Sequence, residues 1–294
     1  MTIREVQCAA ACRRLKRDFP YRWDLNPYRG CAHRCQYCFA VYSHKYLESA
    51  SFYDEIFVKT NIVQRLEYQL SRPDWPREVV NIGGITDSYQ PAEAKYRLMP
   101  DILRLLIRYR TPCIISTKSD LILRDFDLID ELSRKSFVII ASTITTVDED
   151  LRRVLEPGGA SSARRFEMLR AFSRTKACTG LHIMPIIPYL TDGRDNLEGL
   201  AAAGKAAGVQ YVQAATLYLR GGTRQVFFDF IRRERPALAE KLRLLYAPGA
   251  DRKAYKDSLY QMFSAVKKKH GLTDDYAAIM RDRLPRESEQ LSLF

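Results

Sequence analysis

Five short apolar runs that alternate with amphipathic stretches constrain the fold of this 294-residue chain more than any other feature. Gly, Pro or polar residues bound the runs, as expected for strands that are buried on both faces; the runs are 78–84, 112–118, 137–144, 181–188 and 211–219. Between them, apolar residues recur three and four positions apart, which is typical of amphipathic helices; these stretches are 58–71, 99–110, 125–135, 162–175 and 194–207. Such alternation predicts βαβ units and a parallel sheet.

A strand near residues 24–25 would bring the set to six. Because no GxGxxG motif follows any of the strands, we expect an α/β fold of the partial or full βα-barrel type rather than a dinucleotide-binding fold. The strand signal stops after about Pro236, and helical patterns follow at 237–246, 254–269 and 274–281. The sequence therefore predicts a basic N-terminal segment (1–23), a barrel core (24–235) and a helical C-terminal extension (236–294).

No apolar run reaches the roughly 18 residues that a membrane-spanning helix needs, and the N-terminus lacks the apolar core of a secretory signal. We therefore expect a cytoplasmic protein without membrane contact. The net charge is +12, from 47 Lys and Arg against 35 Asp and Glu. This excess favours a nucleic-acid partner without requiring one, since the basic residues at 1–30 and at Lys267–Lys269 are either solvated faces or a track flanking the site. The oligomeric state is not indicated.

Three of the seven cysteines lie close together in the string NPYRGCAHRCQYCFA, residues 26–40. Cys31, Cys35 and Cys38 have the spacing Cys-x3-Cys-x2-Cys, and thiolates are soft ligands suited to zinc and iron–sulfur clusters. A structural zinc site needs a fourth protein ligand, and His33 is the candidate, although it lies too close in sequence to Cys31 and Cys35 to complete a tetrahedron comfortably. A four-iron cluster held by three cysteines instead leaves one iron open for another ligand.

Polar residues follow the predicted strands where their carboxyl ends would meet on one rim. Gly83 and Gly84 lack side chains that would block an approach to the backbone. Lys118 ends a buried apolar run, where a cation is costly unless an anion is paired with it. The rim is therefore the expected place of the chemistry.

The cysteine string, with Tyr37 just before the last cysteine, resembles the radical S-adenosylmethionine (SAM) superfamily. The further strings GGITDSYQPAE, ISTKSDLILRDFDL, LEPGGASSARR and MPIIPYLTD follow in order and are similar to its spore photoproduct lyase-like branch. The similarity spans roughly residues 24–220. It implies a partial (βα)6 TIM-type barrel of the radical SAM kind.

The resemblance also implies a [4Fe–4S] cluster on Cys31, Cys35 and Cys38, and SAM bound at its open iron. Electron transfer from the reduced cluster would cleave SAM and give a 5′-deoxyadenosyl radical, so a flavodoxin- or ferredoxin-like electron donor is expected. By its place in the TKS motif, Lys118 matches the family's lysine at the SAM carboxylate. The other candidates for SAM contacts are Tyr37 near the adenine, Gly83 and Gly84 at the amino group, and Ser116, Ser142, Arg164 and Arg165 at the carboxylate or ribose. For the glycines, serines and arginines, and for Lys118, a purely structural or solvated role is the alternative.

The substrate is less constrained. Family members of known activity repair a thymine lesion in DNA with a cysteine hydrogen donor on the strand after the cluster, but the matching run VVNIGGIT has no cysteine. A radical return step would need Tyr89, Cys113 or regeneration of SAM instead. Three hypotheses stay open: a radical SAM enzyme on a nucleic acid, one on a small molecule, peptide or protein, and a non-catalytic metal-bound nucleic-acid-binding module.

Three cysteines outside these motifs give a weaker indication of function. Cys8 and Cys12 lie four residues apart, which would put both on one face of a helix. With Cys178 they could hold a second metal, but a small buried apolar role is the favoured interpretation.

Overall fold

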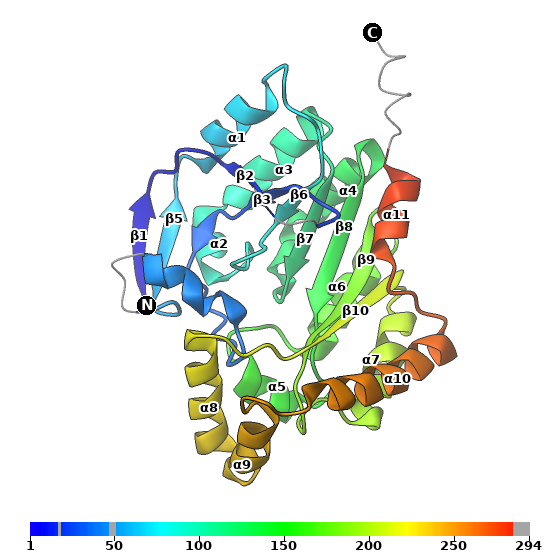
Figure 1. The fold of residues 1–294 in the computed structure, drawn as a ribbon. Helices are drawn as coiled ribbons and strands as arrows, with labels where there is room; N and C mark the ends of the chain where they lie inside the picture. The colour runs from blue at the N-terminus through cyan, green and yellow to red at the C-terminus, as the bar shows by residue number, and fades with distance from the viewer. Residues whose placement is uncertain (17–18, 47–50, 285–294) are drawn as a thin grey trace.

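A seven-stranded sheet forms the centre of the computed structural model, which describes residues 1–16, 19–46 and 51–284 (Figure 1). Its strand order is β10-β9-β8-β7-β6-β3-β2, with β2 antiparallel to β3 and every other neighbouring pair parallel. The strands are β2 (Cys12–Arg14), β3 (Trp23–Leu25), β6 (Val80–Ile82), β7 (Cys113–Thr117), β8 (Val138–Thr143), β9 (Cys178–Ile186) and β10 (Tyr211–Thr216). Six parallel strands therefore follow one another in chain order, which confirms the predicted open βα barrel.

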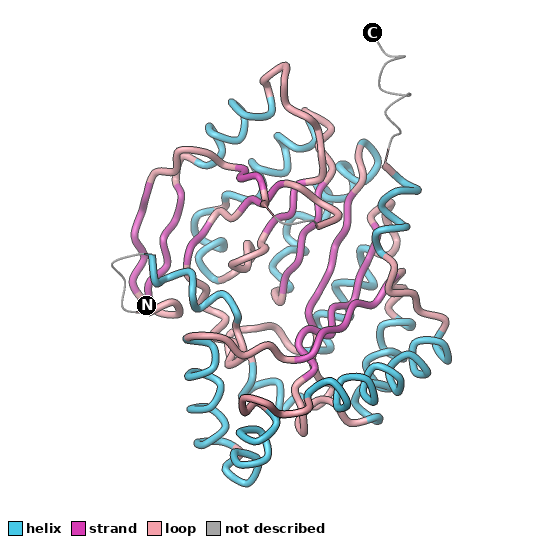
Figure 2. The backbone as a smooth tube through the Cα atoms, viewed as in Figure 1, coloured by secondary structure: helices cyan, strands magenta, loops and turns pink. Residues whose placement is uncertain are grey.

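The helices that connect these strands lie on the outer side of the sheet (Figure 2). Their apolar faces supply the outer core: Leu66 of α1, Ile102 of α3 and Leu169 of α6 are fully buried there. The helices are α1 (Ile62–Leu70), α2 (Pro91–Tyr96), α3 (Leu98–Arg108), α4 (Phe126–Lys135), α5 (Glu149–Leu155), α6 (Ser162–Phe172) and α7 (Arg194–Ala206), with short 3₁₀ helices η1 (Phe39–Tyr46) and η2 (Asp120–Asp125).

The two faces of each barrel strand have different roles. In β7, Cys113 and Ile115 pack in the outer core, whereas Ile114 and Ser116 face a cavity inside the barrel. Successive side chains of a strand point to opposite faces, so the sequence of a strand buried on both sides reads as a continuous apolar run. The few polar residues on the inner face are thereby directed into the interior.

A second, three-stranded sheet lies beside the barrel and was not predicted. Its order is β1-β5-β4, from β1 (Thr2–Val6), β5 (Glu55–Lys59) and β4 (Tyr28–Arg29). The predicted helix over 58–71 is wrong at its start, because residues 55–59 (EIFVK) pair with both β1 and β4 and only the following residues form α1. β-branched and aromatic side chains fit a pleated surface, which explains the strand.

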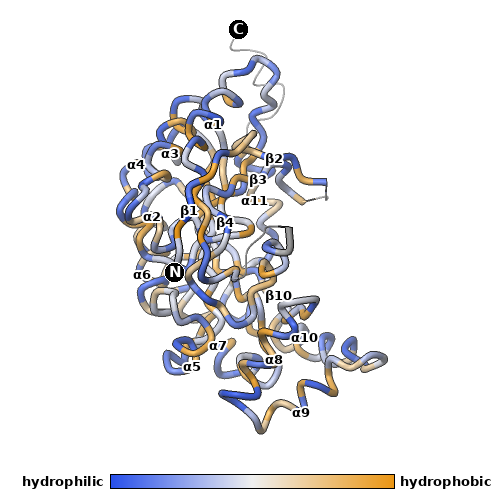
Figure 3. Tube along the Cα trace, turned by 90° about the vertical axis from the view of Figure 1, so that its left-hand side faces the viewer, coloured by the Kyte–Doolittle hydropathy of each residue, from blue (hydrophilic) through white to orange (hydrophobic). Residues whose placement is uncertain are grey.

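The C-terminal helices are α9 (Pro236–Leu245), α10 (Arg252–His270) and α11 (Tyr276–Arg283), as predicted, but a further helix, α8 (Gly222–Glu234), precedes them. Along α9, hydrophilic and hydrophobic residues alternate as an amphipathic helix requires (Figure 3). Helix α10 packs on α7, and Phe263 of α10 joins the main core. The division at residue 236 stays a prediction. Within the described residues, no helix combines the length and apolar character that crossing a bilayer requires.

Candidate active site

One cavity of about 1230 Å³ runs from the carboxyl ends of the barrel strands into the barrel interior. It is lined by the loop that carries the three cysteines, by the ends of β6 to β10 and by the segment before α8. The predicted site residues that line it are Cys31, Cys35, Cys38, Tyr37, Gly83, Gly84, Ser116 and Lys118. Three sequence motifs that are far apart in the chain therefore meet in one place.

The loop of residues 31–38 is held by backbone contacts on several sides. Cys31 donates its N–H to Phe52 O (3.0 Å), and Tyr53 donates its hydroxyl to Cys35 O (2.8 Å). On the other side, Thr223 at the start of α8 donates to Cys38 O (2.9 Å). Gly30 lets the chain pass close to the backbone of Glu55 just before this loop. It has φ +77°, and a Cβ there would lie 2.3 Å from Glu55 O.

The chemistry of the three thiols fits a soft metal centre. All seven cysteines of the chain are free thiols, and Cys31 and Cys35 are buried. Burial raises the pKa of Cys38 to about 12, with the Cys31 charge adding to the effect, and burial also raises the pKa of Cys35. A metal bound at these thiols would supply the positive charge that favours thiolates. Among the described residues, however, no three His, Cys, Asp or Glu side chains are grouped so as to hold a metal ion.

His33 contacts both an acid and one of the cysteines, Cys31. Its Nδ1 lies 3.2 Å from Asp87 Oδ2, and both side chains are almost fully buried. Asp87 is in turn held by Thr117 Oγ1 (2.8 Å) and the Lys118 N–H (2.7 Å). Burial opposes protonation of His33, but Asp87 and Cys31 outweigh it and raise the His33 pKa to about 10. This ion pair joins the cysteine loop to the end of β7.

Lys118 is a partly buried cation without an ion pair among the described residues. Its Nζ lies 5.8 Å from the centroid of the Tyr37 ring, on the wall of the cavity. Burial alone would lower the pKa of Lys118, but the negative charges at Cys35 and Glu156 outweigh it and raise the pKa. The ammonium is therefore charged and available to an anion in the cavity.

Arg165 lies behind this wall and does not line the cavity. Its guanidinium is fully buried, forms an ion pair with Glu156 and donates to Thr143 O (2.8 Å). Tyr37 donates its hydroxyl to the other oxygen of Glu156. Burial opposes ionisation of Glu156, but Arg165 and Lys118 outweigh it and lower its pKa. Glu156 and Thr143 engage one nitrogen of the guanidinium, and the expected contact of Arg165 with SAM stays a prediction.

The remaining predicted cofactor residues divide between the rim and the core. Gly83 (φ +83°) and Gly84 line the cavity, and a Cβ at Gly84 would lie 2.5 Å from Asn81 Nδ2 and from an Asp24 oxygen. Ser116 also lines the cavity. Ser142, by contrast, is fully buried and donates to Thr117 O (2.7 Å), so its hydroxyl is already used.

Tyr89 and Cys113, the predicted candidates for a hydrogen donor, do not line the cavity. Both are fully buried in the outer core, and burial raises the pKa of the Cys113 thiol to about 12. The strand parity explains this: Cys113 points to the opposite face of β7 from Ser116. Neither residue reaches the cavity wall, and their role as hydrogen donor or radical relay stays a prediction.

The other sequence features of uncertain meaning lie away from the cavity. Cys8 and Cys12 are not on a helix, since Cys12 begins β2 and Cys8 contacts Asn61 (Sγ to Oδ1, 3.3 Å). Cys178 is buried at the start of β9. Lys267 and Lys269 lie on α10 in ion pairs with Asp274 and Glu198, and neither lines the cavity mouth.

Aromatic side chains surround the cavity mouth; of these, the sequence offered Tyr42 as a candidate for stacking on bases or relaying a radical, with a structural role as the favoured alternative. Phe39, Tyr42 and Tyr218 are each about half exposed, at 53%, 48% and 62%, and all three line the cavity. Arg220, also exposed, lines the same edge. No sequence pattern marked Phe39, Tyr218 or Arg220, because η1 and the loop after β10 are brought together only by the fold.

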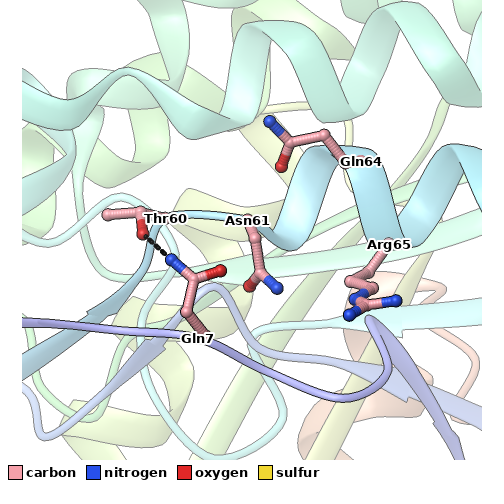
Figure 4. A pocket seen from close by; sticks show the side chains of 5 residues that line it. All are labelled: Gln7, Thr60, Asn61, Gln64 and Arg65. Atoms are coloured by element: carbon pink, nitrogen blue, oxygen red, sulfur yellow. Dashed lines mark hydrogen bonds between the residues drawn. The ribbon is translucent and has the colours of Figure 1, made fainter.

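A smaller polar pocket of about 520 Å³ lies apart from this cavity, between the segment after β1 and the start of α1 (Figure 4). Gln7 donates to Thr60 Oγ1 (2.9 Å), and the other lining residues are Asn61, Gln64 and Arg65. It shares no lining residue with the cysteine cavity.

Comparison with known proteins agrees with this geometry. The family model described as Radical SAM superfamily matches residues 25–200. An uncharacterized protein of Mycobacterium tuberculosis is 34% identical over 282 residues, covering 94% of this chain and 83% of that protein. An uncharacterized protein of Methanocaldococcus jannaschii is 28% identical over 171 residues, covering 58% of this chain and 62% of that protein.

Solved structures of spore photoproduct lyase share the fold. The enzyme complexed with dinucleoside spore photoproduct has a TM-score of 0.66 and 13% identity, covering 91% of this chain and 79% of that chain. A mutant with bound AdoMet and the same dinucleoside gives 0.66 and 12%, covering 91% and 78%. At such low identity the likeness concerns the fold alone.

Proposed function

The chain belongs to the radical SAM superfamily, and we propose from this premise that it cleaves SAM reductively at a [4Fe–4S] cluster held by Cys31, Cys35 and Cys38. When bound, the cluster and SAM supply the electron transfer and the 5′-deoxyadenosyl radical that family membership implies. The observation that carries the proposal is the free ammonium of Lys118, which lines the same cavity as the three thiols. The electron donor would be flavodoxin- or ferredoxin-like, and the location cytoplasmic.

The chain's own residues would bind and orient SAM. Lys118 would pair with the carboxylate, because a charge-assisted contact inside a partly buried cavity is stronger than one in water. The side-chain-free segment Gly83–Gly84 would let its backbone groups meet the amino group. Tyr37 would lie against the ligand with its ring fixed from behind by Glu156.

Electrostatic balance behind the site supports this assignment. Glu156 forms its ion pair with the buried Arg165. Lys118 is therefore able to pair with a ligand carboxylate. The His33 and Asp87 pair likewise neutralises itself. A ligand carboxylate therefore fits the charge of Lys118, which has no ion pair within the part of the chain that the structure describes.

We favour a nucleic acid as the substrate class because of the residues that line the cavity mouth. Three exposed aromatic rings beside an exposed arginine suit bases that stack and a phosphate that needs a cation. The net charge of +12 is in keeping with this partner. A small molecule, peptide or protein is the alternative.

The test is uncoupled turnover. The protein, reconstituted anaerobically with iron and sulfide and given SAM and dithionite, should release methionine and 5′-deoxyadenosine. A control without dithionite should release neither. Deuterated DNA, RNA or a low-molecular-weight extract fraction should then be supplied in turn, and deuterium in 5′-deoxyadenosine identifies the substrate class. Failure to form 5′-deoxyadenosine from a fully iron-loaded protein would contradict the proposal.

A further inference from the structure

The inner end of the cavity, away from the cysteines, is built on two neighbouring strands. In the register of β9 and β10, Gly180 lies opposite Tyr211 and His182 lies opposite Gln213. Residues two apart on a strand share a face, so all four point into the barrel. The Tyr211 ring lies across Gly180, where a Cβ would be 2.1 Å from a ring carbon. Glycine at this position therefore makes room for the ring.

Aromatic rings from outside the barrel complete this end. Tyr276 at the start of α11 stacks on Tyr211 with ring centroids 5.6 Å apart. Tyr21, from the segment before β3, lines the same cavity and stacks on Phe19. Figure 1 places α11 and this segment at the amino ends of the strands, opposite η1 and α8. Aromatic walls of this kind hold planar ligands by stacking.

The polar groups at this end are oriented and partly without partners. His182 Nε2 lies 3.0 Å from the Tyr211 hydroxyl, which fixes both rings. Asn81 donates to Asp24 (2.7 Å), which leaves its carbonyl oxygen for another donor. The side-chain amide of Gln213 has no hydrogen bond to any described residue, although it faces the cavity. The Asn81 oxygen and the Gln213 amide are thus available to a ligand in the cavity.

Most of the charge in the cavity comes from the cysteine loop and the rim. The charged residues that line the cavity are His33, Asp87, Lys118 and Arg220, all from the cysteine loop or the rim. His182 is neutral near pH 7, because burial and then Lys118 lower its pKa to about 4. The cavity of about 1230 Å³ also exceeds the roughly 300–1,000 Å³ of a typical single-ligand pocket. Room for a second ligand therefore exists, on uncharged walls.

We propose that this inner end, formed by Tyr21, Asn81, His182, Tyr211, Gln213 and Tyr276, binds an uncharged planar ring with hydrogen-bonding edges that belongs to the substrate. The proposal rests on the proposed function, since SAM would occupy the Lys118 end of the same cavity. The rings select a flat ligand by stacking, and Gln213 with Asn81 selects polar edges, because an unmatched buried polar group is costly.

Saturation-transfer NMR with three probes tests this on the iron-loaded protein in the presence of SAM. Uracil has polar edges, toluene has none, and cyclohexanol is not planar. We expect uracil to bind and the other two to bind much more weakly. Gln213→Leu should weaken uracil binding about tenfold, as loss of a hydrogen bond to a buried group predicts. Gln225→Leu, on the exposed side of α8, is the matched control and should change nothing.

Two comparisons decide the outcome. Equal binding of uracil and toluene, or unchanged uracil binding in a folded Gln213→Leu protein, overturns the proposal. A short single-stranded oligonucleotide that displaces uracil assigns the ring to a nucleic acid, whereas displacement only by free bases assigns it to a small molecule. Because uracil binding is measured without turnover, a wild-type protein that binds uracil but never cleaves SAM would defeat the proposed function alone.

Discussion

At the scale of single residues, the position of Lys118 shows how a fold can make a cation available. The ammonium lies over the Tyr37 ring, and Glu156, whose charge acts on it, is already paired with Arg165. An unpaired charge in a partly buried place is costly unless a ligand provides the counter-charge. The residue therefore gains its partner only when an anion enters the cavity.

Lys118→Ala should weaken SAM binding, because one charge-assisted contact would be lost. Such contacts contribute about 1.5–3 kcal/mol, or roughly 10- to 150-fold in affinity. Isothermal titration on the iron-loaded protein measures the effect. The matched control is Lys95→Ala, since Lys95 also lies over a tyrosine ring (5.5 Å to Tyr96) but is exposed on α2. Equal affinities in the wild type and Lys118→Ala would remove Lys118 from the site.

The three cysteines should act together in holding iron. Replacing Cys31, Cys35 or Cys38 by Ala should each abolish the roughly four irons per chain and the visible absorption expected of a four-iron cluster. Cys113→Ala should retain both, since Cys113 faces the outer core. Iron analysis after anaerobic reconstitution measures this. Retained iron in the triple variant, with stoichiometric zinc in the wild type, would refute the cluster assignment.

The sequence predicted several residues that the structure brings to the wall of one cavity, but it could not tell which side chains point into that cavity. Ser116 and Ser142 lie near the ends of the neighbouring strands β7 and β8, yet one faces the cavity and the other donates to Thr117 O. Arg165 could not be separated from a ligand-binding arginine, because its partner Glu156 is nine residues away across a turn. His182 and Gln213 gave no sequence signal at all.

At the scale of elements, residues 155–159 hold the cysteine loop (residues 31–38) in place by backbone hydrogen bonds. Gln36 donates its N–H to Leu155 O (2.9 Å), and Gly158 donates to His33 O (3.0 Å). A Cβ at Gly158 would lie 2.6 Å from Ala32 O, so the close approach requires glycine. Glu156, which lies between these two contacts, accepts a hydrogen bond from Tyr37 of the cysteine loop and forms an ion pair with Arg165 of α6.

Glu156→Ala should therefore destabilise the fold strongly, because it leaves the buried Arg165 without its counter-charge. Loss of one partner of a buried pair costs about 3–5 kcal/mol, measured as the free energy of unfolding in urea. The double variant Glu156→Ala with Arg165→Met should recover part of the loss. The control Glu131→Ala removes an exposed ion pair with Lys135 and should have little effect. If the single and double variants were equally unstable, the pair would not be the cause.

The barrel strands and outer helices were predictable from periodicity, because a strand buried on both faces and an amphipathic helix each leave a regular pattern. The small sheet was not, since β1 and β5 pair across some fifty residues and β4 is only Tyr28–Arg29. Non-local pairing leaves no local signal. Helix α8 was not predicted, because the strand pattern was expected to end only at about Pro236.

At the scale of the whole molecule, segments from both ends of the chain meet at the amino ends of the barrel strands. Tyr21 precedes β3, Tyr276 begins α11, and both pack around Tyr211. The opposite end is occupied by the cysteine loop and α8. The cavity therefore has a charged mouth and an uncharged inner end, which is an arrangement suited to a ligand with an ionic part and a flat, neutral part.

The excess positive charge gives the last prediction, on nucleic-acid binding. If a single strand is bound at the mouth, its affinity should fall steeply with salt, with a slope of about 0.7 per neutralised phosphate. Arg220→Glu should lower that slope, because Arg220 is exposed at the cavity edge and has no ion pair with a described residue. Lys269→Glu should change it little, because Lys269 is paired with Glu198 on the outer side of the barrel at α10 (2.9 Å). Fluorescence anisotropy of a labelled oligonucleotide at several salt concentrations measures both slopes. An equal decrease of the salt slope in the two variants would mean that binding is spread over the basic surface. Binding that is absent or independent of salt would favour the small-molecule alternative.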